Sequence, residues 1–241
     1  MLKFIISTPI APGRAENTDK SELITEFLFG DIVRVLDQNG TWVKVVADFD
    51  EYPAWIDKKM ISEVKNELST SIRVINPLQQ VETSSGIMHL PLGAKLYPGV
   101  TVDRAYSADE KHDPLHWALR FLNAPYRWGG KTILGIDCSG LTQVAFSMAG
   151  VDLPRDAWQQ AEQGETIPFV ELAQTNDLAF FDNQEGKIIH VGIVADELDG
   201  RKQIIHASGK VRVDALDHQG IFKEEEGRYS HNLRFIKRIR I

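Results

Sequence analysis

Short runs in which hydrophobic and polar residues alternate occupy the first 65 positions of the chain. Residues 31–36 and 42–47 alternate on either side of Gln38-Asn39-Gly40, and an Asn-Gly pair between flanks of β period is a strong hairpin signal. Residues 9–20 are polar and predict a loop. Further strands are expected at residues 2–7, 22–28 and 52–61. Five short strands in about 60 residues are typical of a small β-barrel.

The pattern changes to a helical period from residue 113 onward. Asp113 followed by Pro114 is a typical pair of N-cap and first helical residue, and it predicts a helix to about residue 123. Residues 138–149 carry apolar side chains at helical spacing and end before Gly150, a helix stop. A further helix and a series of strands are expected at residues 156–163, 179–181, 188–194, 203–207, 211–213 and 233–239. Helices followed by antiparallel strands predict an α+β fold.

Residues 66–111 are less regular than either flank. Strand-like runs at residues 72–75, 87–90 and 95–96 are interrupted by proline and glycine. This segment is interpreted as a partial second β module or a β connector. The chain is therefore divided into a small β domain over 1–65, the connector over 66–111 and an α+β domain over 112–241.

The overall composition excludes some classes of partner. Among 241 residues, 43% are hydrophobic and 25% are charged, as in an ordinary globular protein. The net charge is −7, and no basic stripe is available to neutralise phosphates. We therefore expect no nucleic-acid partner.

The N-terminal residues and the single cysteine favour a cytoplasmic protein. Ser7, Thr8 and Pro9 interrupt the first apolar run too early for the hydrophobic core of a signal peptide. No apolar stretch reaches transmembrane length, and one cysteine needs no oxidising compartment. We expect no membrane association and a cytoplasmic location, unless a leader has been removed.

Cys138 is the only cysteine of the chain and begins the predicted helix of residues 138–149. Helical spacing places it on the same stripe as the apolar residues Leu141 and Ala145. At a helix N-terminus, unpaired backbone N–H groups and the helix dipole stabilise a thiolate, which is the nucleophilic form of cysteine. The alternative is an ordinary core cysteine, because free cysteine is among the most buried residue types.

Two histidines are candidate partners for this thiol. Cysteine hydrolases need an imidazole within hydrogen-bond reach of the thiol and a third group that orients the ring. His190 and His206 interrupt apolar runs in predicted strands on either side of Asp199-Gly200. With a turn centred near Leu198 they would face each other, with Cα atoms about 4.5–5.5 Å apart; another register would move them apart. We hypothesise Cys138 as nucleophile, His190 as general base and then acid, and His206 as orienter, against the alternative of ordinary core or surface histidines.

We expect no metal site at the remaining histidines, and we expect no cofactor. His112 and His116 are four residues apart, but Pro114 lies between them and no further ligand set follows. The other three are placed in or beside loops: His89, His218 and His231.

Several motifs, in order along residues 112–241, resemble the NlpC/p60 cysteine peptidases of bacterial cell-wall metabolism. They are Tyr126-Arg-Trp-Gly-Gly130, Asp137-Cys-Ser-Gly140, Leu153-Pro-Arg-Asp156, Asp177-Leu-Ala-Phe-Phe181, His190-Val-Gly-Ile193 and Ile205-His-Ala207. The resemblance implies a papain-like α+β domain and a Cys-His-His triad at Cys138, His190 and His206. It also implies hydrolysis of γ-D-glutamyl bonds in peptidoglycan stem peptides.

Residues 1–65 resemble the bacterial SH3-like domains that precede such catalytic domains, whereas the connector is too short for a second full one. The whole layout is similar to the γ-D-glutamyl-L-diamino acid peptidases of the dipeptidyl-peptidase VI type. In these enzymes the SH3-like domain helps to bind the free amino group of an N-terminal L-Ala. The resemblance assigns this role to Glu22, with Glu26 as its rival, and to Tyr52. The alternatives are a barrel-surface charge for Glu22 and a core position for Tyr52.

Further substrate contacts follow from the resemblance alone. Asp137 would be a second carboxylate for the ammonium group, Tyr126 would line the site or assist the oxyanion, and Ser139 would contact the substrate backbone. Asp156 is included as a substrate-binding residue. Related enzymes carry a serine at the next position, where this chain has Ala157, so that contact is not carried over.

The leading hypothesis is a cysteine peptidase that releases L-Ala-D-Glu from L-Ala-γ-D-Glu-diamino acid peptides during murein recycling. The main alternative is a secreted or wall-bound peptidoglycan endopeptidase that uses its SH3-like domain for targeting. A silent binding module and an acyltransferase on the same fold are further alternatives. The sequence leaves open the choice between diaminopimelate and lysine in the substrate, and the oligomeric state.

Overall fold

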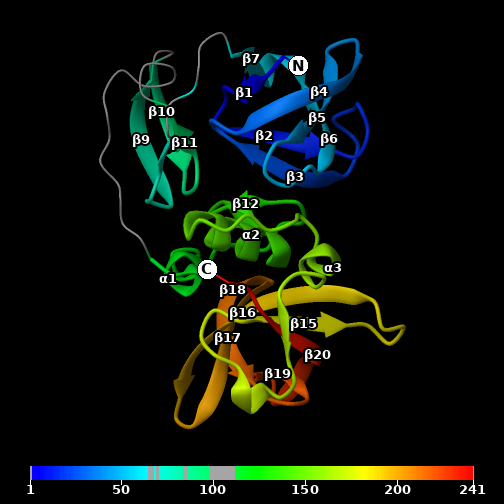
Figure 1. Ribbon diagram of the computed structural model, residues 1–241, viewed down its shortest axis with the longest axis vertical. Coiled ribbons are helices and arrows are strands. Elements are labelled where there is room, and N and C mark those ends of the chain that lie inside the picture. Colours follow the sequence, from blue (N-terminus) through cyan, green and yellow to red (C-terminus); the bar gives the residue numbers. More distant parts are fainter. Residues whose placement is uncertain (1, 65–67, 69–70, 84–85, 98–111, 241) are drawn as a thin grey trace. The chain divides into compact units, whose positions relative to one another are not determined.

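The computed structural model describes residues 2–64, 68, 71–83, 86–97 and 112–240 (Figure 1). The chain divides into two compact units. The first contains Met1–Lys111 and Trp128–Ile133, and the second contains His112–Arg127 and Leu134–Ile241. The predicted domain boundaries at residues 65–66 and 111 fall on residues outside the described ranges. In the described residues, no helix is long and apolar enough to cross a membrane.

The N-terminal part of the first unit is a seven-stranded antiparallel sheet with strand order β3-β2-β6-β5-β4-β1-β7. Its strands are β1 (Phe4–Ile6), β2 (Ile10–Arg14), β3 (Leu23–Leu28), β4 (Ile32–Asn39), β5 (Trp42–Ala47), β6 (Pro53–Asp57) and β7 (Ile61–Glu63), with a 3-10 turn at Lys58–Met60. The predicted hairpin between β4 and β5 is confirmed, and its last pair is Asn39 with Trp42. Phe27, Val33, Val45 and other buried side chains form its core.

The prediction of a loop over residues 9–20 is wrong, because β2 lies within it. Pro12 and Gly13 hid this strand, since both residue types disfavour strand interiors. Gly13 is needed by the packing: a Cβ atom there would lie 2.7 Å from Thr25 Cγ2 and 2.9 Å from Ala54 Cβ. The strand therefore passes too close to its neighbours to carry a side chain at this position.

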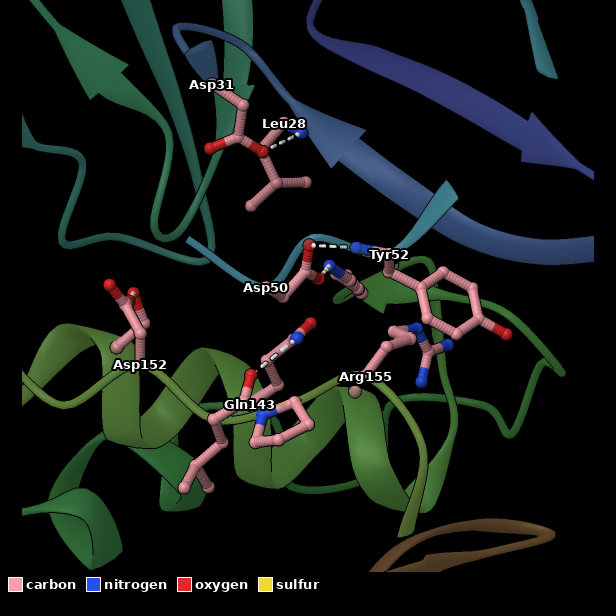
Figure 2. Close-up of polar contacts among 12 residues, drawn as sticks. Leu28, Asp31, Asp50, Tyr52, Gln143, Asp152 and Arg155 are labelled. Carbon is pink, nitrogen blue, oxygen red and sulfur yellow. Dashed lines mark hydrogen bonds and ion pairs between the residues drawn. The ribbon is translucent and has the colours of Figure 1, made fainter. Parts of the chain in front are cut away.

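The connector is a small β module joined to the SH3-like sheet. It contains two antiparallel pairs, β9 (Leu78–Thr83) with β10 (Gly86–Pro91) and β8 (Ile72–Arg73) with β11 (Lys95–Leu96). Its core includes Phe29 from the preceding domain. Lys95 Nζ lies 3.0 Å from Asp31 Oδ1, and Asp31 Oδ2 accepts a hydrogen bond from the Leu28 N–H (Figure 2). β9 was not predicted from the sequence, because it is mostly polar.

The second unit is an α+β domain that is mostly β. Its helices are α1 (Pro114–Leu119), α2 (Cys138–Met148) and α3 (Ala157–Gln160), with a 3-10 turn at Val170–Leu172. Its strands are β13 (Gly135–Ile136), β14 (Glu165–Ile167), β15 (Leu178–Asp182), β16 (Ile188–Leu198), β17 (Arg201–Ser208), β18 (Lys210–Leu216), β19 (Gly220–Lys223) and β20 (Arg228–Arg238); the short β12 (Lys131–Thr132) belongs to the first unit.

A closed barrel forms the centre of this unit. The strand order is β14-β20-β15-β16-β17-β18-β19, and β19 also pairs with β20. The six strands from β15 to β20 therefore close on themselves, and α2 packs against β16 and β17 (Figure 1). The fold class predicted from the sequence is confirmed. The strands differ in part from the prediction: β13, β14 and β19 were not predicted, and β20 begins at residue 228 rather than 233. The early start of β20 was missed because its first residues are polar and mostly exposed.

Candidate active site

The N-terminus of α2 holds the candidate nucleophile. Asp137 is the N-cap, and its Oδ1 accepts a hydrogen bond of 2.7 Å from the Gly140 N–H. Cys138 is the first residue of the helix and is 5% exposed. The following residues of the helix, including Leu141 and Ala145, are buried against the barrel. The predicted helix and the position of Cys138 at its start are thus confirmed.

The free thiol is protonated at neutral pH in this environment. Burial raises the pKa of Cys138 to about 12, and the charge of Asp137 adds to this effect. Hydrogen bonds from the backbone N–H groups of Val191 and Ser139, together with the charge of Arg155, act in the opposite direction. The stabilisation of a thiolate that was expected from the helix N-terminus is therefore outweighed by desolvation, and a base must remove the proton during attack.

His190 and His206 form a buried pair, although not in the predicted register. Within the β16–β17 hairpin, Gly192 rather than His190 is paired with His206. The turn residues Asp199 and Gly200 have positive φ angles, as a two-residue hairpin turn requires. A bulge between Ala195 and Leu198, just before the turn, shifts the register of the two strands. The prediction of directly opposed histidines is therefore wrong.

The two imidazoles meet diagonally across the hairpin on one face of the sheet. His190 Nε2 lies 2.9 Å from His206 Nδ1, and the rings are nearly perpendicular at 86°. Burial lowers the pKa of both side chains, so each is neutral at pH 7. Val191, whose N–H contacts the Cys138 thiol, follows His190 directly in the chain. The general base His190 thus directly precedes the residue that contacts the nucleophile, and its orienter His206 lies on the neighbouring strand β17.

Gly192 makes room for this pair. A Cβ atom at position 192 would lie 2.9 Å from His206 Cβ and 2.7 Å from Ile204 Cδ1. Any larger residue would push the His206 side chain away from His190. The glycine of the His190-Val-Gly-Ile193 motif therefore has a steric function.

Two residues of β18 continue the hydrogen bonds beyond His206, and the sequence analysis missed both. His206 Nε2 lies 2.9 Å from Asp214 Oδ2. Arg212 donates to both oxygens of this carboxylate, from Nε at 2.6 Å and from Nη2 at 2.7 Å. A charged pair at alternate positions of the strand after His206 was the signal that could have indicated them.

His231 is a third histidine of the cluster, and its predicted place in or beside a loop is wrong. It lies in β20, and its ring stacks on that of His190 with centroids 4.1 Å apart. Burial, together with the neighbouring His206, lowers the pKa of His231 to about 4. The alternating polar residues at the start of β20 concealed this strand position.

The three histidines are arranged for hydrogen bonding and stacking rather than for metal ligation. Their nearest ring nitrogens lie within 4.8 Å of one another. However, a metal ion with bonds of about 2.0–2.1 Å must lie in the plane of each ring that ligates it. The rings of His190 and His231 are stacked at 19° with centroids 4.1 Å apart, so their nitrogen lone pairs lie in separate, nearly parallel planes that one ion cannot share. The His206 Nδ1 atom already faces His190.

Asp137 and Ser139, both predicted to contact substrate, are bonded to Arg155. The Arg155 guanidinium donates to Asp137 Oδ1 at 3.1 Å, to Asp137 Oδ2 at 2.6 Å and to Ser139 Oγ at 2.9 Å. Arg155 is 1% exposed, and Gln143 Nε2 anchors its segment by donating to the Leu153 carbonyl (Figure 2). Arg155 was quoted in a motif but was not assigned a role. The geometry gives Asp137 a structural role, and its contact with substrate stays a prediction.

Tyr126 and Asp156 are the other two residues of this unit that were predicted to contact substrate. Burial raises the pKa of Tyr126, and the negative charges of Cys138 and Asp137 raise it further, so the phenol is electrostatically coupled to the site. Asp156 is the N-cap of α3, and its backbone N–H donates to Gln159 Oε1 at 3.1 Å. Neither contact tests a role in substrate binding.

The predicted residues of the first unit differ strongly in burial. Glu22 is exposed, whereas Glu26 is 2% exposed and accepts a hydrogen bond of 2.8 Å from the Lys131 N–H. Tyr52 is half-buried immediately before β6, and its backbone N–H donates to Asp50 Oδ1 (Figure 2). The exposure of Glu22 thus agrees with the alternative of a barrel-surface charge, whereas the Glu26 carboxylate is buried inside this unit.

A thiol at a helix N-terminus beside hydrogen-bonded imidazoles defines the class of cysteine peptidases. The NlpC/P60 family model matches residues 123–227, and the bacterial dipeptidyl-peptidase Sh3 domain model matches residues 13–61. The γ-D-glutamyl-L-lysine dipeptidyl-peptidase of Bacillus subtilis is 30% identical, over 70% of this chain and 68% of the relative. The chain therefore belongs to the NlpC/P60 family of peptidases and carries an SH3-like domain at its N-terminal end.

Two other proteins support the same placement. A γ-D-glutamyl-L-lysine dipeptidyl-peptidase from Bacillus cereus is 27% identical over 87% of this chain and 75% of its own length. The crystal structure of an NlpC/P60 family protein from Bacillus cereus has a TM-score of 0.77 and 20% identity, and the match covers 98% of this chain and 99% of the other. This structural likeness supports the fold.

A methyl group at position 192 should impair catalysis by displacing His206. We expect Gly192→Ala to lower kcat by about ten- to a hundredfold and to cost about 1–3 kcal/mol of unfolding free energy through overpacking. Peptide hydrolysis and urea denaturation measure the two effects. Ile236→Val, a core substitution in β20 at a position that lies opposite Ile167 and Ala179, is the control and should lose stability without a fall in kcat. An unchanged kcat in Gly192→Ala would contradict the steric function.

His231 should make the fold less stable as the pH falls. The unfolded side chain binds its proton near pH 6.5, whereas the folded one binds it near pH 4, so the unfolded state holds more protons between these values. The free energy of unfolding should therefore decrease as the pH is lowered from about 6.5 to about 4. His231→Asn should remove this part of the decrease in urea denaturation at pH 7, 5.5 and 4.5. The control His218→Asn, at an exposed turn position, should leave this decrease in place. If the free energy of unfolding depended on pH equally in the natural protein and in both variants, the prediction would be wrong.

Proposed function

We propose that this peptidase hydrolyses the γ-D-glutamyl bond between D-Glu and the diamino acid of stem peptides that begin with a free L-Ala. The observation that carries the proposal is the position of the Cys138 thiol against Val191 of β16, the strand that bears His190 of the His190–His206 pair. Relatives named γ-D-glutamyl-L-lysine dipeptidyl-peptidase match this chain over most of its length. Their names supply the substrate class.

In the proposed reaction, His190 takes the thiol proton as the sulfur of Cys138 attacks the γ-carbonyl carbon of D-Glu. The backbone N–H of Cys138 at the start of α2 stabilises the oxyanion. The C–N bond then breaks, and the leaving amine of the diamino acid receives the proton from His190. Water, deprotonated by His190, hydrolyses the thioester and releases L-Ala-D-Glu, which restores the thiol.

Removal of a dipeptide requires that the enzyme recognise a free amino group. A buried ammonium group needs a carboxylate partner. Glu22 and Glu26 are the candidates in the SH3-like domain, and the burial of Glu26 favours it over the exposed Glu22. Asp137 is a weaker candidate, because Arg155 already compensates its charge.

A second candidate function is endopeptidase activity on intact peptidoglycan. It is supported by a relative from Bacillus subtilis named bifunctional muramidase/DL-endopeptidase, which is 48% identical over 80 residues. This match covers only 32% of the chain, whereas the dipeptidyl-peptidase matches extend across far more of it. We therefore rank the dipeptidyl-peptidase reading first.

We also propose a cytoplasmic location, where released stem peptides would be recycled. The single cysteine needs no oxidising compartment, in keeping with this location. Fractionation of the native host, with antibody detection in cytoplasm, membrane and culture medium, tests it. Recovery in the medium would instead support the endopeptidase reading.

The substrate proposal predicts strong discrimination between three synthetic peptides. L-Ala-γ-D-Glu-L-Lys, or its diaminopimelate counterpart, should be cleaved with release of L-Ala-D-Glu. The N-acetylated peptide and the isomer linked through the α-carboxyl of D-Glu should each lose at least about a hundredfold in kcat/KM, because a site built for a polar group rejects ligands that leave it unpaired. Equal cleavage of the acetylated peptide, together with cleavage of intact peptidoglycan, would favour the endopeptidase reading.

Replacement of the nucleophile should abolish hydrolysis without unfolding the protein. Cys138→Ala and Cys138→Ser should both reduce kcat to the background rate, since neither can form the thioester. Thermal denaturation checks that the fold is retained. Activity of either variant at the level of the natural protein would refute the assignment of Cys138.

A further inference from the structure

His206 is the last member of the Cys-His-His triad, but its second ring nitrogen also makes a hydrogen bond. His206 is fully buried, and its Nε2 lies 2.9 Å from Oδ2 of Asp214, which is 7% exposed. Arg212 is paired directly with His206 across the β17–β18 ladder, and Asp214 with Ile204. Side chains of one strand alternate between faces, so His206, Arg212 and Asp214 all lie on the same face of the sheet.

The Asp214 carboxyl is held in its ionised form. Arg212 donates to Oδ2 at 2.6 Å and to Oδ1 at 2.7 Å, a two-point contact that fixes both the position and the charge of the carboxylate. Hydrogen bonds from His206 and Arg212 lower the pKa of Asp214 against the opposing effect of burial. Arg212 also lies 3.7 Å from the exposed Glu225.

An ionised carboxylate can only accept hydrogen bonds, and this fact determines the tautomer of His206. Its Nε2 must carry the proton that is donated to Asp214. Because neutral imidazole has a single N–H, Nδ1 of His206 is then an acceptor, and the 2.9 Å contact requires that His190 Nε2 be the donor. His190 is therefore left with an unprotonated Nδ1.

The unprotonated Nδ1 of His190 is the candidate acceptor for the thiol proton. Nδ1 is the ring nitrogen closer to the backbone of its own residue. The Cys138 thiol is hydrogen-bonded to the N–H of Val191, the next residue along that backbone. The unprotonated nitrogen of His190 is thus the one nearer to the backbone segment that contacts the thiol.

We propose that Asp214, held by Arg212, is a positioning residue of the active site that sets the tautomers of His206 and His190 and so presents Nδ1 of His190 to Cys138. The order of hydrogen bonds is Arg212 to Asp214, His206 to Asp214 and His190 to His206. When His190 accepts the thiol proton, its positive charge is stabilised through His206 by the Asp214 carboxylate. The proposal rests on the assignment of Cys138 and His190 above but not on the identity of the peptide.

The tautomers can be measured directly in the full-length protein. Histidine labelled with 15N gives different chemical shifts for protonated and unprotonated ring nitrogens. At pH 7 we expect His206 to carry its proton on Nε2 and His190 also on Nε2. Asp214→Ala should shift the His206 nitrogens toward a mixture of tautomers. A proton on Nδ1 of His206 in the natural protein would overturn the proposal.

Alkylation of Cys138 by iodoacetamide tests the base without any peptide substrate, so a wrong substrate assignment cannot be confused with a wrong relay. Asp214→Ala should slow alkylation at pH 7, and lower kcat on the cleaved peptide, by at least about tenfold, with KM nearly unchanged. Asp214→Asn, which keeps an acceptor oxygen but not the charge, should fall between Asp214→Ala and the natural protein.

The pH profile separates positioning from simple destabilisation. Loss of the Asp214 charge should move the acidic limb of the alkylation rate to lower pH, because a carboxylate favours the protonated imidazoles. The other charged or titratable groups around His206 are Arg212 of β18, Lys223 of β19, His190 of β16 and His231 of β20, and all remain in the variant.

The control variant is Asp217→Ala. It removes a carboxylate of the same barrel that accepts a hydrogen bond from Tyr229, outside the relay. This variant should keep the natural alkylation rate even if its melting temperature falls. An Asp214→Ala protein that is folded and alkylates at the natural rate, with an unshifted acidic limb, would overturn the proposal.

Discussion

The buried hydrogen bond between His190 and His206 is the interaction on which the catalytic unit depends. It requires a hairpin register in which Gly192 faces His206, a glycine that leaves space for the ring, and a closed barrel that removes both imidazoles from water. Because the rings are desolvated, they stay neutral, and each holds its single N–H in a fixed hydrogen bond. The chemistry therefore follows from the way two neighbouring strands are paired.

The second requirement is a fixed N-terminus for α2. The buried ion pair between Arg155 and Asp137 joins the segment before α3 to the helix cap. Removing one partner of a buried pair typically costs about 3–5 kcal/mol, because the other charge is left unpaired. The same contacts also hold Ser139. The Leu153-Pro-Arg-Asp156 motif is thus explained by the position it imposes on the nucleophile.

Sequence patterns were sufficient for the elements in which burial and periodicity agree. The hairpin of β4 and β5, the helix that begins at Cys138 and the central strands of the barrel are of this kind. Sequence patterns were insufficient where contacts with neighbouring strands decide the structure. The strand through Gly13 can form because a glycine lets the neighbouring side chains pack closely against its backbone. The diagonal pairing of the two histidines arises from a bulge between Ala195 and Leu198.

Within the site, the nucleophile and both histidines could be proposed because cysteine chemistry demands a base and an orienter. Asp214 and His231 did not follow from that demand, because their importance lies in contacts with neighbouring strands of the barrel. His231 lies in the polar first part of β20, and pairing of β20 with β15 brings its ring to His190. Long-range closure leaves no local period in the sequence.

The burial of Cys138 also bears on how the enzyme withstands oxidants. Peroxides react with the thiolate rather than with the thiol, and exposed, acidic cysteines are the ones that form sulfenic acid. A side chain that is 5% exposed, with its pKa raised to about 12, presents little thiolate between turnovers. The chain has no second cysteine to reverse damage by forming a disulfide. Keeping the resting sulfur protonated therefore protects a nucleophile that has no internal means of repair.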